Sequence, residues 1–259
     1  MSLTRSAIIA RLRAAGCVFA EDEAQLLLAA ARSPEDLAAM VDRRVDGFPL
    51  EHILGWAEFC GLRIAVDAGV FVPRRRTEFL VRQAACLAPP RAIVVDLCCG
   101  SGAIGTALTT LIDHAELYAA DIEPAAVACA RRNLAPAGGQ VFQGDLYEAL
   151  PMLLRGRIDV LTANVPYVPT DAVELMPPEA RIYEPLVALD GGADGLDILR
   201  RVAAEAPVWL RPGGCLLTES SERQAPTVVE IFARSRLTPR MAQDEEMGAT
   251  VIIGMQDRG

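Results

Sequence analysis

An alternation of short apolar segments with helical patterns, which begins near residue 92, limits the folds open to this chain more than any other feature. A strand followed by a helix and then by another strand is typical of a parallel sheet with helices on its faces. We therefore predict an α/β fold with a doubly wound parallel sheet, followed by a final pair of strands. The predicted strands are 92–97, 116–120, 140–144, 158–163, 215–219, 239–243 and 249–254, and the predicted helices are 102–111, 124–133, 195–209 and 224–234.

The residues before this alternation have a different pattern. Residues 6–45 are rich in Ala and Leu at helical spacing, and Ser33 followed by Pro34 is a favourable helix start. In residues 48–72, glycines interrupt short strand-like segments, which predicts a connecting hairpin, and a helix is expected over 77–87. The predicted domains are a small N-terminal helical domain over 1–48, a β-hairpin linker over 49–75 and the sheet domain over 76–259.

A glycine-rich turn follows the first strand of the sheet domain. Asp96 and Leu97 end that strand, and the loop Cys98-Cys99-Gly100-Ser101-Gly102 leads into the next helix. Such a turn lets backbone amides approach a ligand at a helix N-terminus. A dinucleotide loop carries Gly at its first position and faces a pyrophosphate, whereas this loop has Cys98 there and an acid before it. The loop therefore favours a ligand without phosphates, and S-adenosylmethionine is such a ligand.

Acidic residues follow the ends of three successive strands, at Asp96, Asp121 and Asp145. Asp121 lies at the spacing where an acid meets ribose hydroxyls, and Asp145 could accept from an adenine amino group while Leu146 packs on the ring. Each acid has an equally good interpretation as a helix cap. Because open α/β sheets bind ligands at the carboxyl ends of their strands, the three together favour a cofactor crevice. The predicted cofactor residues are Asp96, Cys98, Cys99, Gly100, Ser101, Gly102, Asp121, Ile122, Asp145, Leu146 and Asn164.

The tetrapeptide Asn164-Val165-Pro166-Tyr167 ends the strand predicted over 158–163. The Asn side-chain oxygen and the next backbone carbonyl are two acceptors that can hold both N–H bonds of an amide or amino group. Pro166 stiffens the turn, and Tyr167 offers a flat wall for a flat substrate group. By itself the tetrapeptide is more simply an ordinary turn. Its position downstream of the cofactor crevice makes it the predicted place where a nitrogen receives a methyl group.

Composition excludes several classes of protein. With 52% hydrophobic and 23% charged residues among 259, the chain can bury a large core. No run reaches the ~18 apolar residues of a membrane span, and the N-terminus lacks a signal-peptide pattern, so we expect a cytoplasmic location without membrane contact. The 7 Cys include no C-x-x-C motif and there are 2 His, so neither a metal nor a disulfide framework is expected. The net charge of −9 argues against nucleic acid as a partner.

In their order along the chain, these motifs resemble the HemK/PrmC family of S-adenosylmethionine-dependent protein-(glutamine-N(5)) methyltransferases. The resemblance runs from about Pro49 to Met255 and includes three further segments. They are Pro49-Leu50-Glu51-His52-Ile53-Leu54-Gly55, Phe71-Val72-Pro73-Arg74-Arg75-Arg76-Thr77-Glu78, and Tyr183-Glu184-Pro185-Leu186-Val187-Ala188-Leu189 with Gly191-Gly192.

The resemblance implies a class I methyltransferase fold, which is Rossmann-like with a seven-stranded sheet. It implies that the loop from Cys98 to Gly102, Asp121 and the Asp145-Leu146 edge hold S-adenosylmethionine. It also implies that Asn164 and the Val165 backbone hold a glutamine amide. Asn164, Pro166 and Tyr167 then become the expected catalytic residues, and peptide chain release factors, methylated on the Gln of a Gly-Gly-Gln motif, become the expected protein substrates.

This chain departs from the family's pattern at the acceptor turn, in the arginine motif and in the N-terminal unit. Val165 replaces a Pro, although its carbonyl can still accept a hydrogen bond. Arg75 replaces a Pro and Arg76 replaces an acid, so the charge near the cleft changes sign. The N-terminal helical unit is also shorter than the family's pattern leads us to expect.

Two other functions are open at this point. A nucleic-acid amino methyltransferase, acting on adenine or guanine, would use the same acceptor turn with Tyr167 stacking on the base. A relative that binds the cofactor without turnover would agree with Val165 and Arg76. We assign no general base, because Asp159 and Glu219 lie on predicted strands where a structural role is at least as good an interpretation. The segment 166–194 is predicted to be a long irregular loop that gates the substrate.

Overall fold

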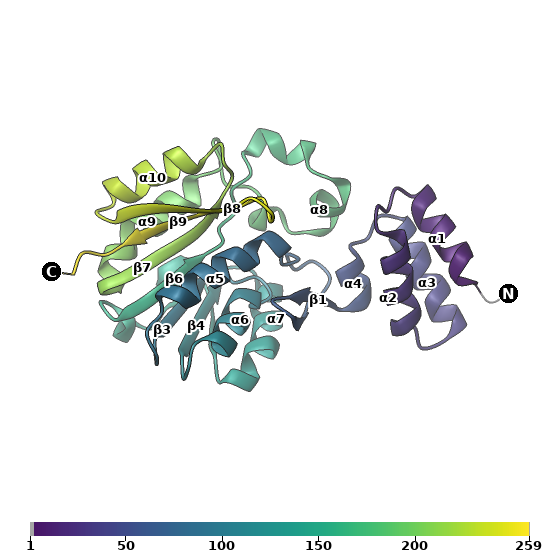
Figure 1. Cartoon of the computed structure of the whole chain (residues 1–259), viewed down its shortest axis with the longest axis horizontal. Helices are drawn as coiled ribbons and strands as arrows, with labels where there is room; N and C mark the ends of the chain where they lie inside the picture. The colour runs from purple at the N-terminus through teal and green to yellow at the C-terminus, as the bar shows by residue number, and fades with distance from the viewer. Residues whose placement is uncertain (1–2, 259) are drawn as a thin grey trace.

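A mixed seven-stranded sheet forms the centre of the larger part of the molecule (Figure 1). The computed structural model describes residues 3–258, so residues 1, 2 and 259 of the predicted domains lie outside the described residues. The strand order is β5-β4-β3-β6-β7-β9-β8. The strands are β3 (Ile93–Leu97), β4 (Glu116–Asp121), β5 (Gln140–Gln143), β6 (Ile158–Ala163), β7 (Leu210–Ser220), β8 (Thr238–Asp244) and β9 (Ala249–Met255).

The strands from β3 to β7 are parallel, which confirms the predicted arrangement for this part of the sheet. The final pair is different, because β9 runs antiparallel to both β7 and β8. Strand order reverses between β3 and β6, which are neighbours in the sheet although β4 and β5 separate them in sequence. Leu97 of β3 lies opposite Ala120 of β4 and Ala163 of β6, so these strands end level with one another. Such a reversal is where open α/β sheets bind ligands.

Helices cover both faces of the sheet. On one face lie α5 (Glu78–Leu87), α6 (Ala103–Leu111) and α7 (Pro124–Leu134), and on the other lie α9 (Asp197–Trp209) and α10 (Ala225–Arg234). Successive strand residues point to opposite faces, so Val94 packs into one buried cluster and Val95 into the other. Because these central strands are buried on both faces, their sequences are continuous apolar runs.

The N-terminal helices lie at one end of the molecule, away from the sheet (Figure 1). They have their own buried core, which includes Ile8, Leu12, Leu27 and Val41. The elements are α1 (Arg5–Ala14), α2 (Ala20–Ala30), α3 (Pro34–Val45) and α4 (Leu50–Leu54), followed by the antiparallel strands β1 (Trp56–Phe59) and β2 (Leu62–Ala65). The expected cap at Ser33 is confirmed, since its Oγ accepts from Asp36 N at 3.2 Å. The domain boundaries at residues 48 and 75 stay predictions.

The segment 166–194 was expected to be irregular, and this expectation is wrong in part. It contains the 3-10 turns η5 (Thr170–Leu175) and η6 (Leu186–Ala188) and the helix α8 (Pro178–Tyr183). Figure 1 shows α8 between the sheet and the N-terminal helices. The Tyr183 hydroxyl donates to the Asp46 carbonyl at 3.2 Å, and its ring lies 4.2 Å from that of Phe48 between centroids. This segment therefore contacts the N-terminal helical unit. Within residues 3–258, the structure has no helix long and apolar enough to cross a bilayer.

Candidate active site

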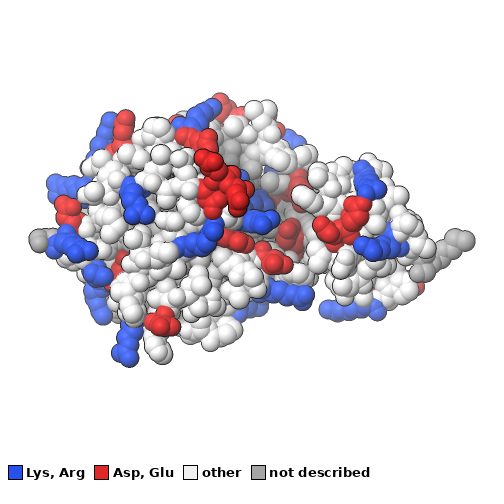
Figure 2. Space-filling model, in the orientation of Figure 1, with Lys and Arg blue, Asp and Glu red and all other residues white. Residues whose placement is uncertain are grey.

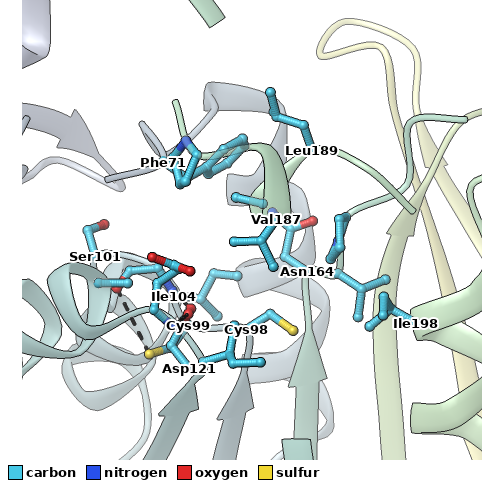
Figure 3. A pocket seen from close by; sticks show the side chains of 18 of the residues that line it. Phe71, Cys98, Cys99, Ser101, Ile104, Asp121, Asn164, Val187, Leu189 and Ile198 are labelled. Carbon is cyan, nitrogen blue, oxygen red and sulfur yellow. Dashed lines mark hydrogen bonds between the residues drawn. The ribbon is translucent and has the colours of Figure 1, made fainter. Parts of the chain in front are cut away.

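A cavity lies at the carboxyl ends of β3, β4 and β6, at the reversal of strand order (Figure 3). The structure brings together at its wall every predicted site residue except Asp96 and Gly102. Those at the wall are Cys98, Cys99, Gly100, Ser101, Asp121, Ile122, Asp145, Leu146, Asn164, Val165, Pro166 and Tyr167. Residues that the sequence did not single out complete the wall, among them Phe59, Ile104, Ile198 and Arg201.

The loop between β3 and α6 is held in a left-handed backbone conformation. Cys98, Gly100 and Gly102 have φ of 54°, 53° and 77°, which is costly for a residue with a Cβ such as Cys98. A Cβ on Gly102 would lie 3.1 Å from that of Ala130, so this glycine allows α6 and α7 to approach. A Cβ on Gly100 would meet nothing within 4 Å. Gly100 therefore leaves open space beside the loop, where a ligand can approach the backbone.

The carboxylate of Asp121 lies beside this open space (Figure 3). Its Oδ2 accepts from Gly100 N at 2.8 Å and its Oδ1 from Glu123 N at 2.9 Å. Each carboxylate oxygen has room for a second donor, so hydroxyl groups can still bind here. Burial raises the pKa of this carboxyl above its usual value, while the two backbone donors lower it. Asp121 thus faces the cavity, whereas its alternative interpretation as the cap of α7 is wrong, because Glu123 is the N-cap of that helix and Asp121 accepts from Glu123 N in the turn before it.

Asp96 lies beneath the loop and is fully buried. Its Oδ1 accepts from the Thr162 hydroxyl at 2.9 Å and its Oδ2 from Gly105 N at 3.2 Å. Burial raises the pKa of Asp96 to about 7. Because Asp96 joins β3, β6 and the first turn of α6, its position favours the structural interpretation, and its direct contact with a cofactor stays a prediction.

Asp145 lies at the cavity edge and pairs with Arg201 of α9. Its Oδ2 accepts from Arg201 Nη2 at 2.7 Å. Its side chain does not cap the 3-10 turn η3 (Leu146–Ala149) that follows, so that alternative is wrong. Leu146 is buried with φ of 48° and lines the cavity next to this pair. The sequence could not reveal the pair, because its partners lie 56 positions apart.

The acceptor turn carries two oxygens that receive no hydrogen bond from residues 3–258, and its residues Asn164 and Val165 line the cavity. Among the described residues, Asn164 Oδ1 is buried and has no hydrogen-bond partner. The Val165 carbonyl likewise receives no donor from residues 3–258, and the side chain of Val165 is buried. A buried acceptor left without a donor costs free energy unless a ligand supplies one. An N–H group of a ligand would therefore satisfy acceptors that the described residues leave unpaired.

The buried carboxylate of Glu219 offsets the positive charge of Arg76, the residue that replaces an acid of the family's motif. Arg76 Nε donates to Oε1 of Glu219 at 2.6 Å, and the guanidinium also donates to the Tyr167 hydroxyl. That hydroxyl donates to Glu219 Oε1 at 3.2 Å, and the Thr77 hydroxyl donates to Oε2 at 2.5 Å. Burial and the Glu219 charge raise the pKa of Tyr167 to about 12, so its phenol stays protonated. The expected change of charge sign is thus neutralised within the protein.

The segment 166–194 covers one side of the cavity. Met176, Pro185, Val187 and Leu189 line it. The segment is fixed through Glu184, whose side chain is 1% exposed and accepts from Arg74 Nη2 at 2.7 and 2.5 Å. Arg74 and Glu184 belong to two of the segments that resemble the family, and this ion pair joins those two segments in the structure. Whether this wall opens for a substrate stays a prediction.

The charges of the cavity indicate what can bind there. Each arginine at its wall already pairs with a carboxylate, namely Arg74 with Glu184, Arg76 with Glu219 and Arg201 with Asp145. Among the described residues, this wall therefore offers a pyrophosphate no unpaired arginine. A ligand that carries hydroxyls, an amino group and positive charge instead matches the carboxylates, the open backbone of Gly100 and the free acceptors of the turn.

The chain is similar to several known methyltransferases. The methyltransferase small domain family matches residues 61–180. The release factor glutamine methyltransferase of Geobacter sulfurreducens is 40% identical over 86% of this chain and 79% of its own length. That of Gloeobacter violaceus is 39% identical over 77% of this chain and 71% of its own length.

A relative with another substrate also matches. The 4-amino-L-phenylalanine/4-methylamino-L-phenylalanine methyltransferase of Streptomyces pristinaespiralis is 34% identical over 74% of this chain and 68% of its own length. Among solved structures, a Pyrococcus furiosus methyltransferase has a TM-score of 0.55 at 13% identity, covering 75% of this chain and 89% of its own. A Lactobacillus delbrueckii ribosomal protein methylase has a TM-score of 0.53 at 16% identity, covering 76% and 86%. These two likenesses concern the fold alone, and both agree with a class I methyltransferase.

Proposed function

This chain belongs to the release factor glutamine methyltransferase family, and we propose that it methylates the side-chain amide nitrogen of a glutamine in a peptide chain release factor. The methyl donor in this proposal is S-adenosylmethionine. The single observation that carries the proposal is the buried Asn164 Oδ1 without a partner, next to the free Val165 carbonyl, at the wall of the cavity.

The residues at the cavity fit this cofactor. Asp121 retains an acceptor position on each oxygen for ribose hydroxyls, and Leu146 and Ile198 offer apolar contacts beside Asp145 for a ring. The backbone at Gly100 is open to a close approach. The pairing of every wall arginine with a carboxylate supports a cofactor without phosphates.

When bound, S-adenosylmethionine supplies an electrophilic methyl group, so the chain's own task is to orient the acceptor. An amide nitrogen is a weak nucleophile because its lone pair is delocalised into the carbonyl. Asn164 Oδ1 and the Val165 carbonyl accept its N–H bonds and favour a geometry that frees the lone pair. The buried walls around Val165 and Pro166 exclude water from this point.

No side chain is needed as a general base. Glu219 is already occupied by Arg76, Thr77 and Tyr167, and the Tyr167 phenol is protonated at neutral pH. After transfer, the nitrogen carries an extra proton and loses it readily to water. We therefore infer that catalysis here consists of positioning and of stabilising charge at the nitrogen.

The surface supports a protein substrate more than a nucleic-acid backbone. The net charge is −9, and on the face shown in Figure 2 Arg side chains lie interspersed with Asp and Glu. A nucleic-acid enzyme needs a continuous basic surface along the phosphates. We place the reaction in the cytoplasm, where translation is terminated.

A second candidate substrate is a free aromatic amine. The relative from Streptomyces pristinaespiralis is named for such a substrate, and the same two acceptors could hold an aryl amino group. Phe71 and Val187 at the cavity wall could pack on its ring.

The experiment that tests the proposal uses labelled S-adenosylmethionine with the purified protein and purified release factors. Mass spectrometry should find one added methyl group on the Gln of the Gly-Gly-Gln loop. An aromatic amino acid with a free aryl amine, and total RNA and DNA, are offered in parallel. Label in the aryl amine alone would replace the release factor with the second candidate, and label in nucleic acid alone would overturn the proposal.

A further inference from the structure

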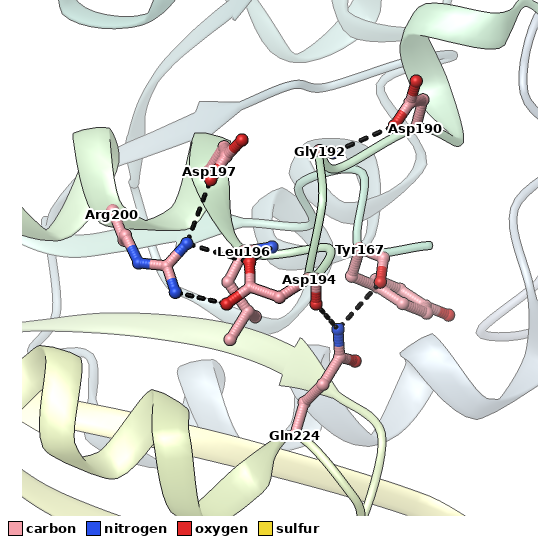
Figure 4. Close-up of polar contacts among 8 residues, drawn as sticks. All are labelled: Tyr167, Asp190, Gly192, Asp194, Leu196, Asp197, Arg200 and Gln224. Atoms are coloured by element: carbon pink, nitrogen blue, oxygen red, sulfur yellow. Dashed lines mark hydrogen bonds and ion pairs between the residues drawn. The ribbon is translucent and has the colours of Figure 1, made fainter. Parts of the chain in front are cut away.

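Gln224 lies behind the acceptor turn and joins two loops that are distant in sequence (Figure 4). Its side-chain Nε2 donates to the Tyr167 carbonyl at 2.9 Å and to the Asp194 carbonyl at 3.0 Å. Its Oε1 accepts from the Ser221 hydroxyl at 2.7 Å. The residue is 9% exposed. Both of its N–H bonds are thus used on backbone carbonyls in a buried place, where an unmade hydrogen bond is costly.

The two loops that Gln224 joins are in backbone contact with each other. Val168 N donates to the Leu189 carbonyl at 3.0 Å, and Gly191 N donates to the Val168 carbonyl at 2.8 Å. A Cβ on Gly191 would lie 2.6 Å from the Pro166 carbonyl oxygen, and one on Gly195 would clash with the Tyr167 carbonyl. Glycine is required at these places because the loops approach so closely. The loop 189–195 is therefore a rigid backing for the acceptor turn.

Acidic side chains of the backing itself bond to the neighbouring backbone (Figure 4). Asp190 Oδ1 accepts from Gly192 N at 2.9 Å, and Asp194 Oδ1 accepts from Leu196 N at 3.1 Å. Asp194 also pairs with Arg200 of α9. The backing is anchored to α9, and Gln224 ties both the backing and the turn to the start of α10.

Gln224 is not among the residues that line the cavity. We propose that Gln224 is a positioning residue for methyl transfer, which holds the acceptor turn so that Asn164 Oδ1 and the Val165 carbonyl face the acceptor nitrogen. This inference rests on the proposed function. It assigns to Gln224 an effect on the acceptor side of the cavity, since its donor bonds go to Tyr167 of the acceptor turn and to Asp194 rather than to the cofactor loop from Cys98 to Gly102.

The test compares Gln224→Met, which keeps length and loses the donors, with Gln224→Glu and with the control Ser221→Ala. Ser221→Ala removes the partner of Oε1 and the hydroxyl that accepts from Gln224 N at 3.2 Å, but it leaves both donor bonds to the loops. Gln224→Met should lower kcat by about 10- to 100-fold, the scale of a small misplacement, and leave cofactor affinity within about three-fold. Ser221→Ala should stay within about three-fold of wild type in kcat. Cofactor affinity is measured by calorimetry on each full-length variant.

Gln224→Glu adds a readout that a general loss of stability would not give. A protonated Glu can donate one hydrogen bond to a loop carbonyl, whereas an ionised Glu faces two carbonyl oxygens and repels them. The activity of this variant relative to wild type should therefore fall as pH rises. A pH-independent ratio, or a wild-type kcat in Gln224→Met, would overturn the proposal, as would an equal loss of cofactor affinity and kcat.

A measurement without substrate separates this inference from the proposed function. In Gln224→Met, hydrogen exchange at the Val168 amide should accelerate while exchange in β3 and β6 stays unchanged. If the wild type methylates none of the offered acceptors, the proposed function fails and the exchange result still decides whether Gln224 holds the turn. Unchanged exchange at Val168 would show that it does not.

Discussion

The guanidinium of Arg76 and the carboxylate of Glu219 meet at 2.6 Å across 143 positions of sequence, beside the phenol of Tyr167. The Glu219 side chain is 3% exposed and that of Arg76 is 45% exposed, so the arginine covers a buried acid from the solvent side. Burial of an acid at this position needs a cationic partner. The arginine that departs from the family's motif is therefore part of the wall next to the acceptor turn.

Arg76→Ala should lower the free energy of unfolding, because it leaves the Glu219 carboxylate buried without its cation. We expect a loss of about 1–3 kcal/mol, below the value for a fully buried pair since Arg76 is partly exposed. Urea unfolding measures it. The double variant Arg76→Ala with Glu219→Gln should recover most of the loss. Equal stability of wild type and the single variant would show that the pair contributes nothing.

Asn164→Ala should lower methyl transfer by ~100-fold or more while cofactor affinity changes only a few-fold, as for a lost contact to the reacting nitrogen. The physical reason is that one of the two acceptors for the amide N–H bonds disappears. Single-turnover kinetics measure the chemical step, and calorimetry measures the cofactor. A variant that transfers methyl groups at the wild-type rate would remove Asn164 from the catalytic role.

Asp121→Ala should weaken cofactor binding by about 1–3 kcal/mol, the scale of a lost charge-assisted pair of hydrogen bonds. Asp121→Asn is the matched control, since it keeps the size of the side chain and one oxygen that can accept from Gly100 N. The loss of cofactor affinity in Asp121→Asn should be smaller than that in Asp121→Ala. Calorimetry on the three proteins checks this order, and unchanged affinity in Asp121→Ala would place the ribose elsewhere.

Asp96 should make the protein less stable as pH rises. Burial raises its folded pKa to about 7, above the ordinary value of about 4 in the unfolded chain, so the folded state binds the extra proton between these values. The penalty is absent below pH ~4 and complete above pH ~7, where it amounts to at most ~4 kcal/mol. Asp96→Asn keeps the acceptor for Gly105 N and does not titrate.

Urea unfolding of both proteins from pH 4 to pH 8 checks this expectation. The free energy of unfolding of Asp96→Asn should fall less over this range and exceed that of wild type at the upper end. Parallel curves for the two proteins would show that folding does not raise the pKa of Asp96, so that its carboxyl is already ionised at low pH in the folded state. The sign of this dependence is opposite to that of a salt-bridged surface acid.

Local patterns were enough to predict the parallel strands, the glycine loop and the position of the acceptor turn. Each of these depends on neighbours in sequence: apolar runs form strands, and the residues after their carboxyl ends must meet at one edge of the sheet. For this reason the strand pattern alone placed Asp121 and Asn164 at one cavity, although 43 positions separate them. The order of motifs, rather than any one motif, also indicated the family.

Only the tertiary structure decided which charges meet. Three ion pairs join residues that are distant in sequence: Arg76 with Glu219, Arg74 with Glu184, and Arg201 with Asp145. No periodicity marks such partners, because side-chain pairing depends on which loops the packed helices bring together. For the same reason the sequence could not reveal the role of Gln224. This residue lies at the start of α10 and donates to two carbonyls on loops that are 30 and 57 positions away. The sequence by itself determined which residues line the cavity, and packing decided which side chains hold them there.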